Sequence, residues 1–205
     1  MPVLTDLLRP FLAKPLSTGQ TKQVVTYLDL LLKWNAKISL TAVRAPEEIV
    51  QRHFGESFFA AERAGAAEAS SLIDVGSGAG FPGLPMAILA PETQVTLIES
   101  QQKKVAFLRE VVRALELKNV SVYAGRAEGA NRRAQIVTMR AVEKFESVLP
   151  IAASLVEADG TLALLIGVSQ EDRVRRETTN FLWSDPISVP KSRERILVMG
   201  RRGAA

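Results

Sequence analysis

Residues 71–85 read SLIDVGSGAGFPGLP, and this stretch decides the fold. Residues 71–75 have the pattern of a short strand, and glycines follow at positions 76, 78, 80 and 83. The apolar residues of 81–90 then have a helical pattern, whose first turn tolerates the prolines. A glycine-rich turn between a strand and its helix lets a ligand approach the main chain. The stretch therefore predicts a ligand-binding loop between Asp74 and Gly83.

The alternation of strand and helix patterns continues after this loop. Short runs rich in Val and Ile predict strands at 71–75, 94–100, 119–123, 134–139, 160–166 and 195–199. Helical patterns occupy 81–90, 102–117, 143–157 and 169–182. Such alternation indicates an α/β fold, with a mostly parallel sheet and helices on both faces. We expect the tail from Met199 to fray.

The residues before this domain have a helical pattern. Apolar residues recur at helical spacing within 22–34, and residues 46–64 begin with a proline and two acids before another amphipathic run. We therefore expect a helical N-terminal extension over 1–65 and one compact α/β domain over 66–205.

Composition excludes several classes of protein. The chain has 205 residues and no cysteine, which excludes disulfides, thiolate metal sites and a cysteine nucleophile. Its one histidine, His53, makes no metal cluster, and among neighbouring phenylalanines it is expected to be structural. The longest apolar run, 162–168, is too short to span a bilayer, and charges interrupt the N-terminal apolar stretch. We expect a cytoplasmic protein without a metal.

An acidic residue ends the second predicted strand. Glu99 lies 25 residues after Asp74, a spacing at which a carboxylate accepts hydrogen bonds from both ribose hydroxyls of a nucleoside. A solvated carboxylate is the alternative. A dinucleotide requires the spacing G-x-G-x-x-G, whereas these glycines alternate at 76, 78 and 80. The alternation after Asp74 favours S-adenosylmethionine, because an acidic residue can help to hold its ammonium group.

Several motifs resemble those of one family. They are DVGSGAGFPGLP (74–85), TLIES (96–100), GRAEG (125–129), TMRAV (138–142), and, over the rest of the chain, LLKWNAKISLTAV (31–43), RHFGES (52–57) and KSRERILVM (191–199). Together they are similar to the glucose-inhibited division protein B family, the bacterial 16S rRNA guanine-N7 methyltransferases. The resemblance implies a class I methyltransferase fold, Rossmann-like, with a seven-stranded mostly parallel sheet and an antiparallel last strand. It also implies S-adenosylmethionine as cofactor and a guanine near the decoding region of the small ribosomal subunit as target.

The resemblance further implies which residues bind the cofactor. It assigns the cofactor to the glycine loop with Phe81 beside it, Glu99 to the ribose, and Ala127 with Glu128 to the adenine. Arg140 matches the arginine that the family has between cofactor and RNA. The expected cofactor-binding residues are Asp74, Gly76, Ser77, Gly78, Gly80, Phe81, Glu99, Ser100, Ala127, Glu128 and Arg140.

The chain is short for the family, and it departs from the family pattern at two positions. Glu56 stands where an aspartate is more usual, and no lysine occurs near Gly167. Both departures affect the expected RNA contacts.

Arginines are expected at the carboxyl edge of the sheet. Arg126, Arg132 and Arg133, together with Arg140, are candidates for binding RNA phosphates. The alternative for Arg140 is a structural ion pair with Glu128 or Glu143. The expected partner is 16S rRNA in the small subunit, bound by a monomer.

The chemistry expected for guanine N7 needs no general base, because this atom carries an available lone pair. Cytosine C5 methylation through a cysteine adduct is excluded by composition. The residues after the fourth strand, TMRAVEK, lack the (Asp/Asn)-Pro-Pro-aromatic motif of exocyclic-amine methylation. The alternatives are a methyltransferase for another RNA or a small molecule, and a nucleoside- or RNA-binding module without turnover.

Overall fold

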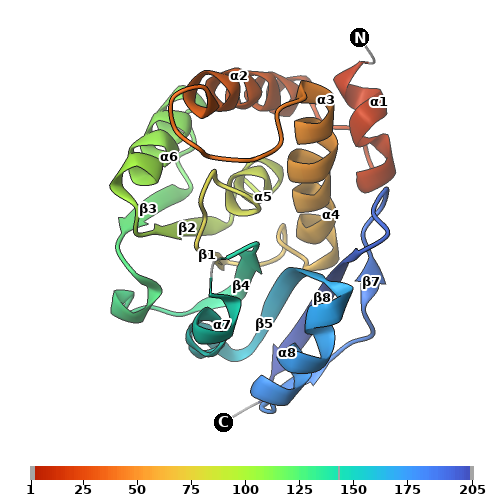
Figure 1. Cartoon of the computed structure of the whole chain (residues 1–205), viewed down its shortest axis with the longest axis vertical. Coiled ribbons are helices and arrows are strands. Elements are labelled where there is room, and N and C mark those ends of the chain that lie inside the picture. The colour runs from red at the N-terminus through yellow and green to blue at the C-terminus, as the bar shows by residue number, and fades with distance from the viewer. Residues whose placement is uncertain (1–2, 143, 204–205) are drawn as a thin grey trace.

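The computed structural model describes residues 3–142 and 144–203. One sheet runs through the middle of the molecule, with helices on both faces (Figure 1). Its strands follow the order β3-β2-β1-β4-β5-β8-β6, and β7 pairs with β8. They are β1 (Ser71–Val75), β2 (Gln94–Glu99), β3 (Val120–Ala124), β4 (Ala134–Arg140), β5 (Val156–Gly167), β6 (Phe181–Trp183), β7 (Ile187–Ser188) and β8 (Arg195–Arg202).

The pairing of these strands confirms the expected α/β class. The sheet is parallel from β3 through β5, and β8 pairs antiparallel with β5, β6 and β7. The two-residue β7 adds to the seven strands of the main path. The chain moves outward from β1 to β2 and β3, and then returns to the other side of β1 as β4. The strand order therefore reverses at β1, where open α/β sheets bind their ligands.

Successive strand residues point to opposite faces of the sheet and enter separate cores. Leu72 and Leu97 belong to one core, whereas Ile73 and Ile98 belong to the other. The first face is covered by α1 (Leu4–Leu8), α2 (Thr18–Asn35), α3 (Pro46–Ile49), the π-helix η2 (Val50–Gly55), α4 (Glu56–Arg63), α5 (Gly83–Leu89) and α6 (Gln102–Ala114). The second face is covered by α7 (Phe145–Ser154) and α8 (Glu171–Glu177) (Figure 1). Short 3-10 turns occupy Arg9–Phe11, Ala127–Gly129 and Val168–Gln170.

The N-terminal helices share the first core with the sheet. Ser17 caps α2 in a reciprocal capping box with Gln20, which satisfies backbone donors that would otherwise have no partner. Val24, Tyr27 and Leu31 then lie on one helical face and are fully buried. Because these side chains pack in the same cluster as the strand residues, the helical extension and the sheet are stabilised together.

Two expectations for the C-terminal part were wrong. The helix expected over 169–182 ends at Glu177, and Phe181–Trp183 forms β6. The tail does not fray at Met199, because β8 continues to Arg202 and is paired on both sides, with Thr161 opposite Arg201 and Phe181 opposite Arg202. Within 143–157 the helix covers Phe145–Ser154, and residue 143 lies outside the described residues.

None of the helices within the described residues is long and apolar enough to cross a membrane.

Candidate active site

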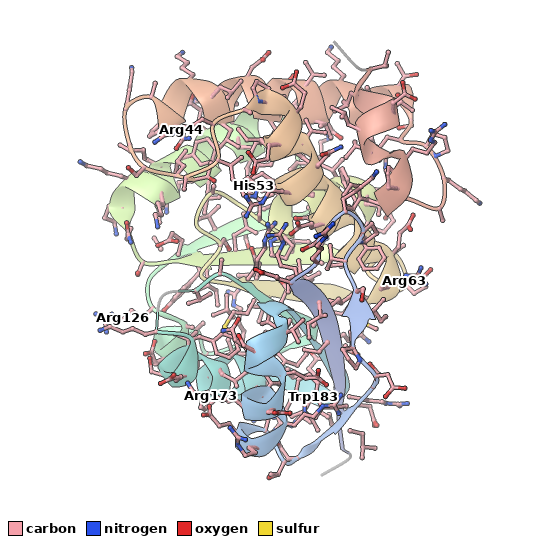
Figure 2. The ribbon with its side chains drawn as sticks, turned by 45° about the vertical axis from the view of Figure 1, so that its right-hand side comes forward. Arg44, His53, Arg63, Arg126, Arg173 and Trp183 are labelled. Atoms are coloured by element: carbon pink, nitrogen blue, oxygen red, sulfur yellow. The ribbon has the colours of Figure 1, made fainter. Side chains whose placement is uncertain are left out.

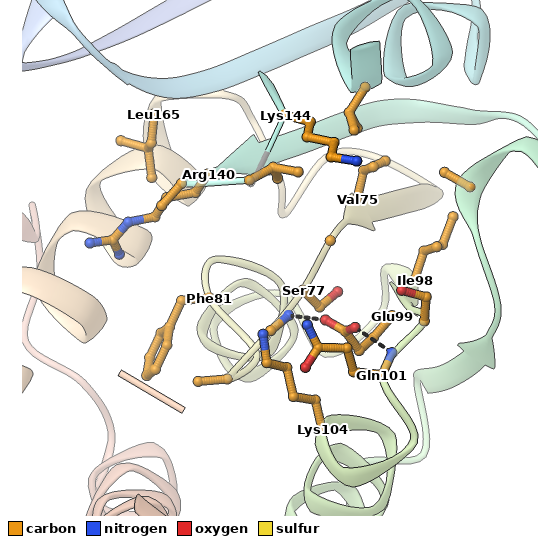
Figure 3. Close-up of a pocket in the computed structure, with 18 of the residues that line it drawn as sticks. Val75, Ser77, Phe81, Ile98, Glu99, Gln101, Lys104, Arg140, Lys144 and Leu165 are labelled. Carbon is orange, nitrogen blue, oxygen red and sulfur yellow. Dashed lines mark hydrogen bonds between the residues drawn. The ribbon is translucent and has the colours of Figure 1, made fainter. Parts of the chain in front are cut away.

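A cavity of about 760 Å³ opens at the carboxyl ends of β1, β2 and β4 (Figure 3). It lies where the strand order reverses, as the glycine loop predicted. The walls come from the ends of these strands and from a loop of the N-terminal region. Lining residues from the expected set are Gly76, Ser77, Gly78, Phe81, Glu99, Ser100, Arg126, Ala127, Glu128 and Arg140. Lining residues outside that set include Thr41, Arg52, His53, Gln101, Lys104, Val142, Lys144 and Arg195.

The glycines of the loop serve different purposes. Gly76, Gly78 and Gly80 all have positive φ, at 68°, 57° and 92°, a conformation that disfavours side chains. A Cβ at Gly76 would lie 2.9 Å from Val142, and one at Gly80 would collide with Leu84 and Tyr27. Of these three glycines, only Gly78 would accept a Cβ without a clash, because the nearest atom, the Gly76 carbonyl oxygen, would lie 3.7 Å away. Gly78 therefore borders the cavity, whereas Gly80 allows the loop to pack on the protein interior.

Asp74 lies behind the loop rather than in the cavity. Its side chain is fully buried, and its carboxylate accepts hydrogen bonds from the Gly83 amide at 3.1 Å and the Thr138 hydroxyl at 3.0 Å. Burial raises the pKa of Asp74 to about 6, against the effect of these hydrogen bonds. Asp74 is not among the residues that line the cavity, and it joins the loop to α5 and β4.

Glu99 lines the cavity at the end of β2. The side chain is 6% exposed at the end of β2, and its oxygens accept hydrogen bonds from the amides of Gly78 at 3.0 Å and Gln101 at 2.7 Å (Figure 3). A carboxylate offers about four acceptor positions. The remaining positions are available to a ligand, while the bonds already made fix the carboxylate against the glycine loop.

Phe81 packs against several rings of the N-terminal region. Tyr27 stacks on it at 5.2 Å between ring centroids, and His53 lies 4.9 Å from it at an angle of 30°. The Tyr27 hydroxyl also donates to the Ala79 carbonyl in the glycine loop. Helix α2 and η2 thus help to fix the loop, so residues of the N-terminal region support the wall of the cavity.

The arginines expected at the carboxyl edge separate into two groups. Arg126 lines the cavity and projects outward from the ribbon (Figure 2). Arg132 and Arg133 precede Ala134, the first residue of β4, so they lie at the amino end of that strand. Arg132 donates to Thr96 in β2 at 3.1 Å. Their expected placement at the carboxyl edge is therefore wrong, because the chain enters β4 there instead of leaving it.

Arg140 ends β4 and makes a buried ion pair, with a partner that the sequence did not indicate. Its Nη2 atom lies 3.0 Å from Glu56 Oε2, outside hydrogen-bond geometry, and donates to the Arg52 carbonyl at 2.6 Å. The partner is thus Glu56 and not Glu128, and Glu143 lies outside the described residues. Glu56 also accepts from Arg195. The guanidinium of Arg140 points away from the Glu99 side of the cavity (Figure 3).

His53 is hydrogen-bonded at both ring nitrogens. Nδ1 lies 3.3 Å from Arg140 Nη2, and Nε2 lies 2.7 Å from the Thr41 hydroxyl. Burial, aided by Arg140 and other cations, lowers the pKa of His53 to about 3. The ring is therefore neutral at physiological pH. Residues 41, 53 and 140 are too far apart in sequence for a local pattern to have revealed this chain of contacts.

No group of three or more His, Asp or Glu side chains that could hold a metal ion occurs within residues 3–142 and 144–203.

Comparisons with known proteins agree with this geometry. A family model described as GidB, rRNA small subunit methyltransferase G, matches residues 20–197. A relative from Roseiflexus sp. (strain RS-1), named Ribosomal RNA small subunit methyltransferase G, is 38% identical over 197 residues, which are 90% of this chain and 84% of the relative.

Solved structures share the fold at low identity. Ribosomal protein L11 methylase from Lactobacillus delbrueckii subsp. bulgaricus is 12% identical, with a TM-score of 0.63 over 75% of this chain and 79% of that one. M. jannaschii TYW2, solved in complex with AdoMet, is 16% identical, with a TM-score of 0.60 over 83% of this chain and 80% of that one. These likenesses support the class I methyltransferase fold. Together with the family match over most of the chain, they lead to one conclusion: the chain belongs to the rRNA small subunit methyltransferase G family.

Proposed function

We propose that this protein transfers a methyl group from S-adenosylmethionine to N7 of a guanine in the 16S rRNA of the small ribosomal subunit. The observation that carries the proposal is the cavity at the reversal of strand order, where Glu99 and Gly78 form one wall. Family membership supports the rRNA substrate.

The residues present suit a nucleoside cofactor. Gly76 and Gly78 have positive φ and no Cβ, so a ligand can approach their main chain. Glu99 keeps acceptor positions for ribose hydroxyls. Ser77, Phe81, Ser100, Ala127 and Glu128 line the same cavity and complete the proposed cofactor contacts. When bound, S-adenosylmethionine supplies an electrophilic methyl group. Asp74 and Gly80 support the loop from behind.

Methyl transfer to guanine N7 requires the protein to position the base and to exclude water, and it requires no proton transfer. Guanine N7 already has a lone pair, and correct positioning of reactants can contribute roughly 7–11 kcal/mol. The low pKa of His53, about 3, and its two hydrogen bonds argue against a proton-accepting role. Arg140 is a positioning residue in this proposal, because it contacts Glu56, Arg52 and His53 at the cavity wall.

Cations at the cavity suit a polyanionic substrate. Arg52, Lys104, Arg126 and Lys144 line it, and such side chains neutralise RNA phosphates. We propose that Arg126 contacts the backbone near the target, and that Arg132 and Arg133 contribute only if the RNA also reaches the other edge of the sheet. We propose that the protein acts as a monomer, because one chain supplies the residues that line this cavity. Because bacterial ribosomal subunits are cytoplasmic, the proposal implies a cytoplasmic enzyme.

A transfer assay tests the proposal. Small subunits that lack the modification are incubated with S-adenosylmethionine carrying a radiolabelled methyl group, and label in the 16S rRNA is counted. The wild type should transfer label. Glu99→Ala should weaken cofactor binding, measured by calorimetry, by about 10- to 100-fold, because hydrogen bonds to a charged acceptor contribute roughly 1.5–3 kcal/mol.

Glu92→Ala is the matched control, since it removes an exposed carboxylate before β2. It should bind cofactor like the wild type. Cofactor binding without label transfer would contradict the enzyme and favour a binding module, and unchanged cofactor affinity of Glu99→Ala would reject the ribose role.

A further inference from the structure

Thr41 lies on a loop that is held over the cavity. This loop, residues 36–45, joins α2 to α3 and is the long curve between them in Figure 1. Asn35, which is 5% exposed, accepts from the amides of Leu40 at 2.9 Å and Thr41 at 3.0 Å, and donates to the Thr41 carbonyl at 3.0 Å. Arg44 donates to the Asn35 carbonyl at 2.9 Å. These bonds fix the backbone of Thr41, which is one of the residues that line the cavity.

The hydrogen-bond chain defines where the protons lie. A guanidinium only donates, so Arg140 requires His53 Nδ1 to be the acceptor. A neutral imidazole then carries its proton on Nε2, which donates to the Thr41 hydroxyl oxygen at 2.7 Å. The Val43 amide donates to the same oxygen at 3.1 Å.

The Thr41 hydroxyl is therefore left as a donor. A hydroxyl has two acceptor lone pairs and one hydrogen, and both lone pairs are used by His53 and Val43. With this tautomer, no acceptor within the described residues is hydrogen-bonded to the hydrogen. A half-buried donor on a cavity wall favours a ligand that presents an acceptor.

We propose that the Thr41 hydroxyl donates a hydrogen bond to O6 of the target guanine and selects guanine over adenine. The proposal rests on the proposed function. On the edge that carries N7, guanine presents O6 as a second acceptor, whereas adenine presents an amine donor. A fixed donor beside N7 pairs with guanine and faces the donor of adenine. His53 and Arg140 then orient the Thr41 hydroxyl. The role of the buried His53 is therefore to orient this hydroxyl and not to transfer a proton.

The tautomer is tested first, by a measurement independent of activity. Because His53 is the only histidine of the chain, a tag-free protein labelled with ¹⁵N-histidine gives a single set of ring signals. Long-range ¹H–¹⁵N correlations should identify the neutral form protonated at Nε2. A proton on Nδ1 would overturn the proposal, since the Thr41 hydroxyl would then have to donate to His53.

The recognition is tested by changing the protein and the base together. Small subunits are reconstituted with guanine, with inosine, which keeps O6, or with 2-aminopurine, which keeps N7 but lacks O6, at the position that wild type methylates. For wild type, kcat/KM should be similar with inosine and fall about 10-fold with 2-aminopurine. With guanine, kcat/KM of Thr41→Val should be about 10-fold below that of wild type. With 2-aminopurine, kcat/KM of this variant should fall little further.

Controls separate this result from a structural effect. Thr41→Ser keeps the hydroxyl and should restore sensitivity to O6, and Thr5→Val changes an exposed threonine of α1 and should behave like wild type. Cofactor affinity of Thr41→Val should remain that of wild type. If removal of O6 lowers kcat/KM by the same factor for Thr41→Val and for wild type, Thr41 contacts something other than O6, such as a phosphate, and the proposal is wrong. Absence of transfer by wild type would instead reject the proposed function.

Discussion

The Glu56 carboxylate lies 3.0 Å from Nη2 of Arg140 and joins the end of β4 to α4. Its other oxygen pairs with Arg195 of β8, so one carboxylate contacts two guanidinium groups. The side chains of Glu56 and Arg140 are 2% and 10% exposed. Burial lowers the pKa of Arg140, and the charge of Glu56 opposes that shift. The glutamate that departs from the family pattern thus holds the back of the cavity together.

Glu56→Gln should destabilise the fold strongly. Removing the charge leaves two guanidinium groups without compensation, and breaking a buried pair in this way costs about 3–5 kcal/mol. Urea denaturation measures the loss. Glu48→Gln is the matched control, because Glu48 pairs with Arg52 at an exposed site where a pair contributes at most about 1 kcal/mol. Equal effects of the two substitutions would mean that the Glu56 cluster is not a buried ion pair in solution.

Arg140→Ala and Arg195→Ala should differ in function more than in stability. Each removes one partner of Glu56 and leaves the other, but only Arg140 contacts His53. We expect methyl transfer by Arg140→Ala to fall at least about 10-fold further than its cofactor affinity, and Arg195→Ala to be less affected. Single-turnover transfer and calorimetry measure the two quantities. Similar transfer rates in both variants would remove Arg140 from the positioning role.

The contacts behind the loop glycines predict that Gly78→Ala and Gly80→Ala act on different properties. A methyl group at Gly78 makes no clash with the protein but occupies a position that borders the cavity, and the left-handed backbone there costs roughly 1–2 kcal/mol. At Gly80 it collides with Leu84 and Tyr27. Gly78→Ala should therefore weaken cofactor binding and fold well, whereas Gly80→Ala should lose more stability. Wild-type cofactor affinity of Gly78→Ala would show that the loop does not contact the ligand.

Asp74 and His53 should give opposite pH dependences of stability. The folded pKa of Asp74, about 6, exceeds its ordinary value of 3.8, so the folded state binds more protons and stability falls as pH rises between these values. The folded pKa of His53, about 3, is below its ordinary 6.5, so stability rises with pH over that window. The two contributions largely cancel between pH 4 and pH 6.

Single substitutions should reveal each contribution. Relative to wild type, Asp74→Asn should make the free energy of unfolding rise with pH, and His53→Gln should make it fall, each by up to about 1.4 kcal/mol per pH unit. Urea denaturation at several pH values between 4 and 6 measures the slopes. Changes of the same sign in both variants would contradict the buried state of one of these groups.

Strands β1 to β5 and β8, the glycine loop and the place of Glu99 could be predicted from the sequence because each depends on a local pattern. The apolar run of β1 followed by glycines and small residues indicates a strand and then a tight turn. Glu99 at the end of β2 follows this turn at the spacing that is usual for a nucleoside-binding fold. Arg132 and Arg133 were misplaced because the chain direction at β4 decides which edge they occupy. Glu56, His53 and Thr41 could not be assigned partners, because their contacts join residues up to 139 positions apart.

The short β6 could not be predicted either, because it also depends on a contact that is distant in sequence. Its three residues are a strand only because β8 supplies an edge to pair with, and the chain after Glu177 has no alternation of its own to indicate it.

Identification of the methylated nucleoside tests the central claim most directly. Small subunits labelled by the wild-type protein are digested to nucleosides, and the labelled product is separated by chromatography and identified by mass spectrometry. The account predicts that the label is in N7-methylguanosine from the 16S rRNA, and that Glu99→Ala releases far less of it at limiting cofactor. Label in another nucleoside, or in protein instead of RNA, would contradict the account.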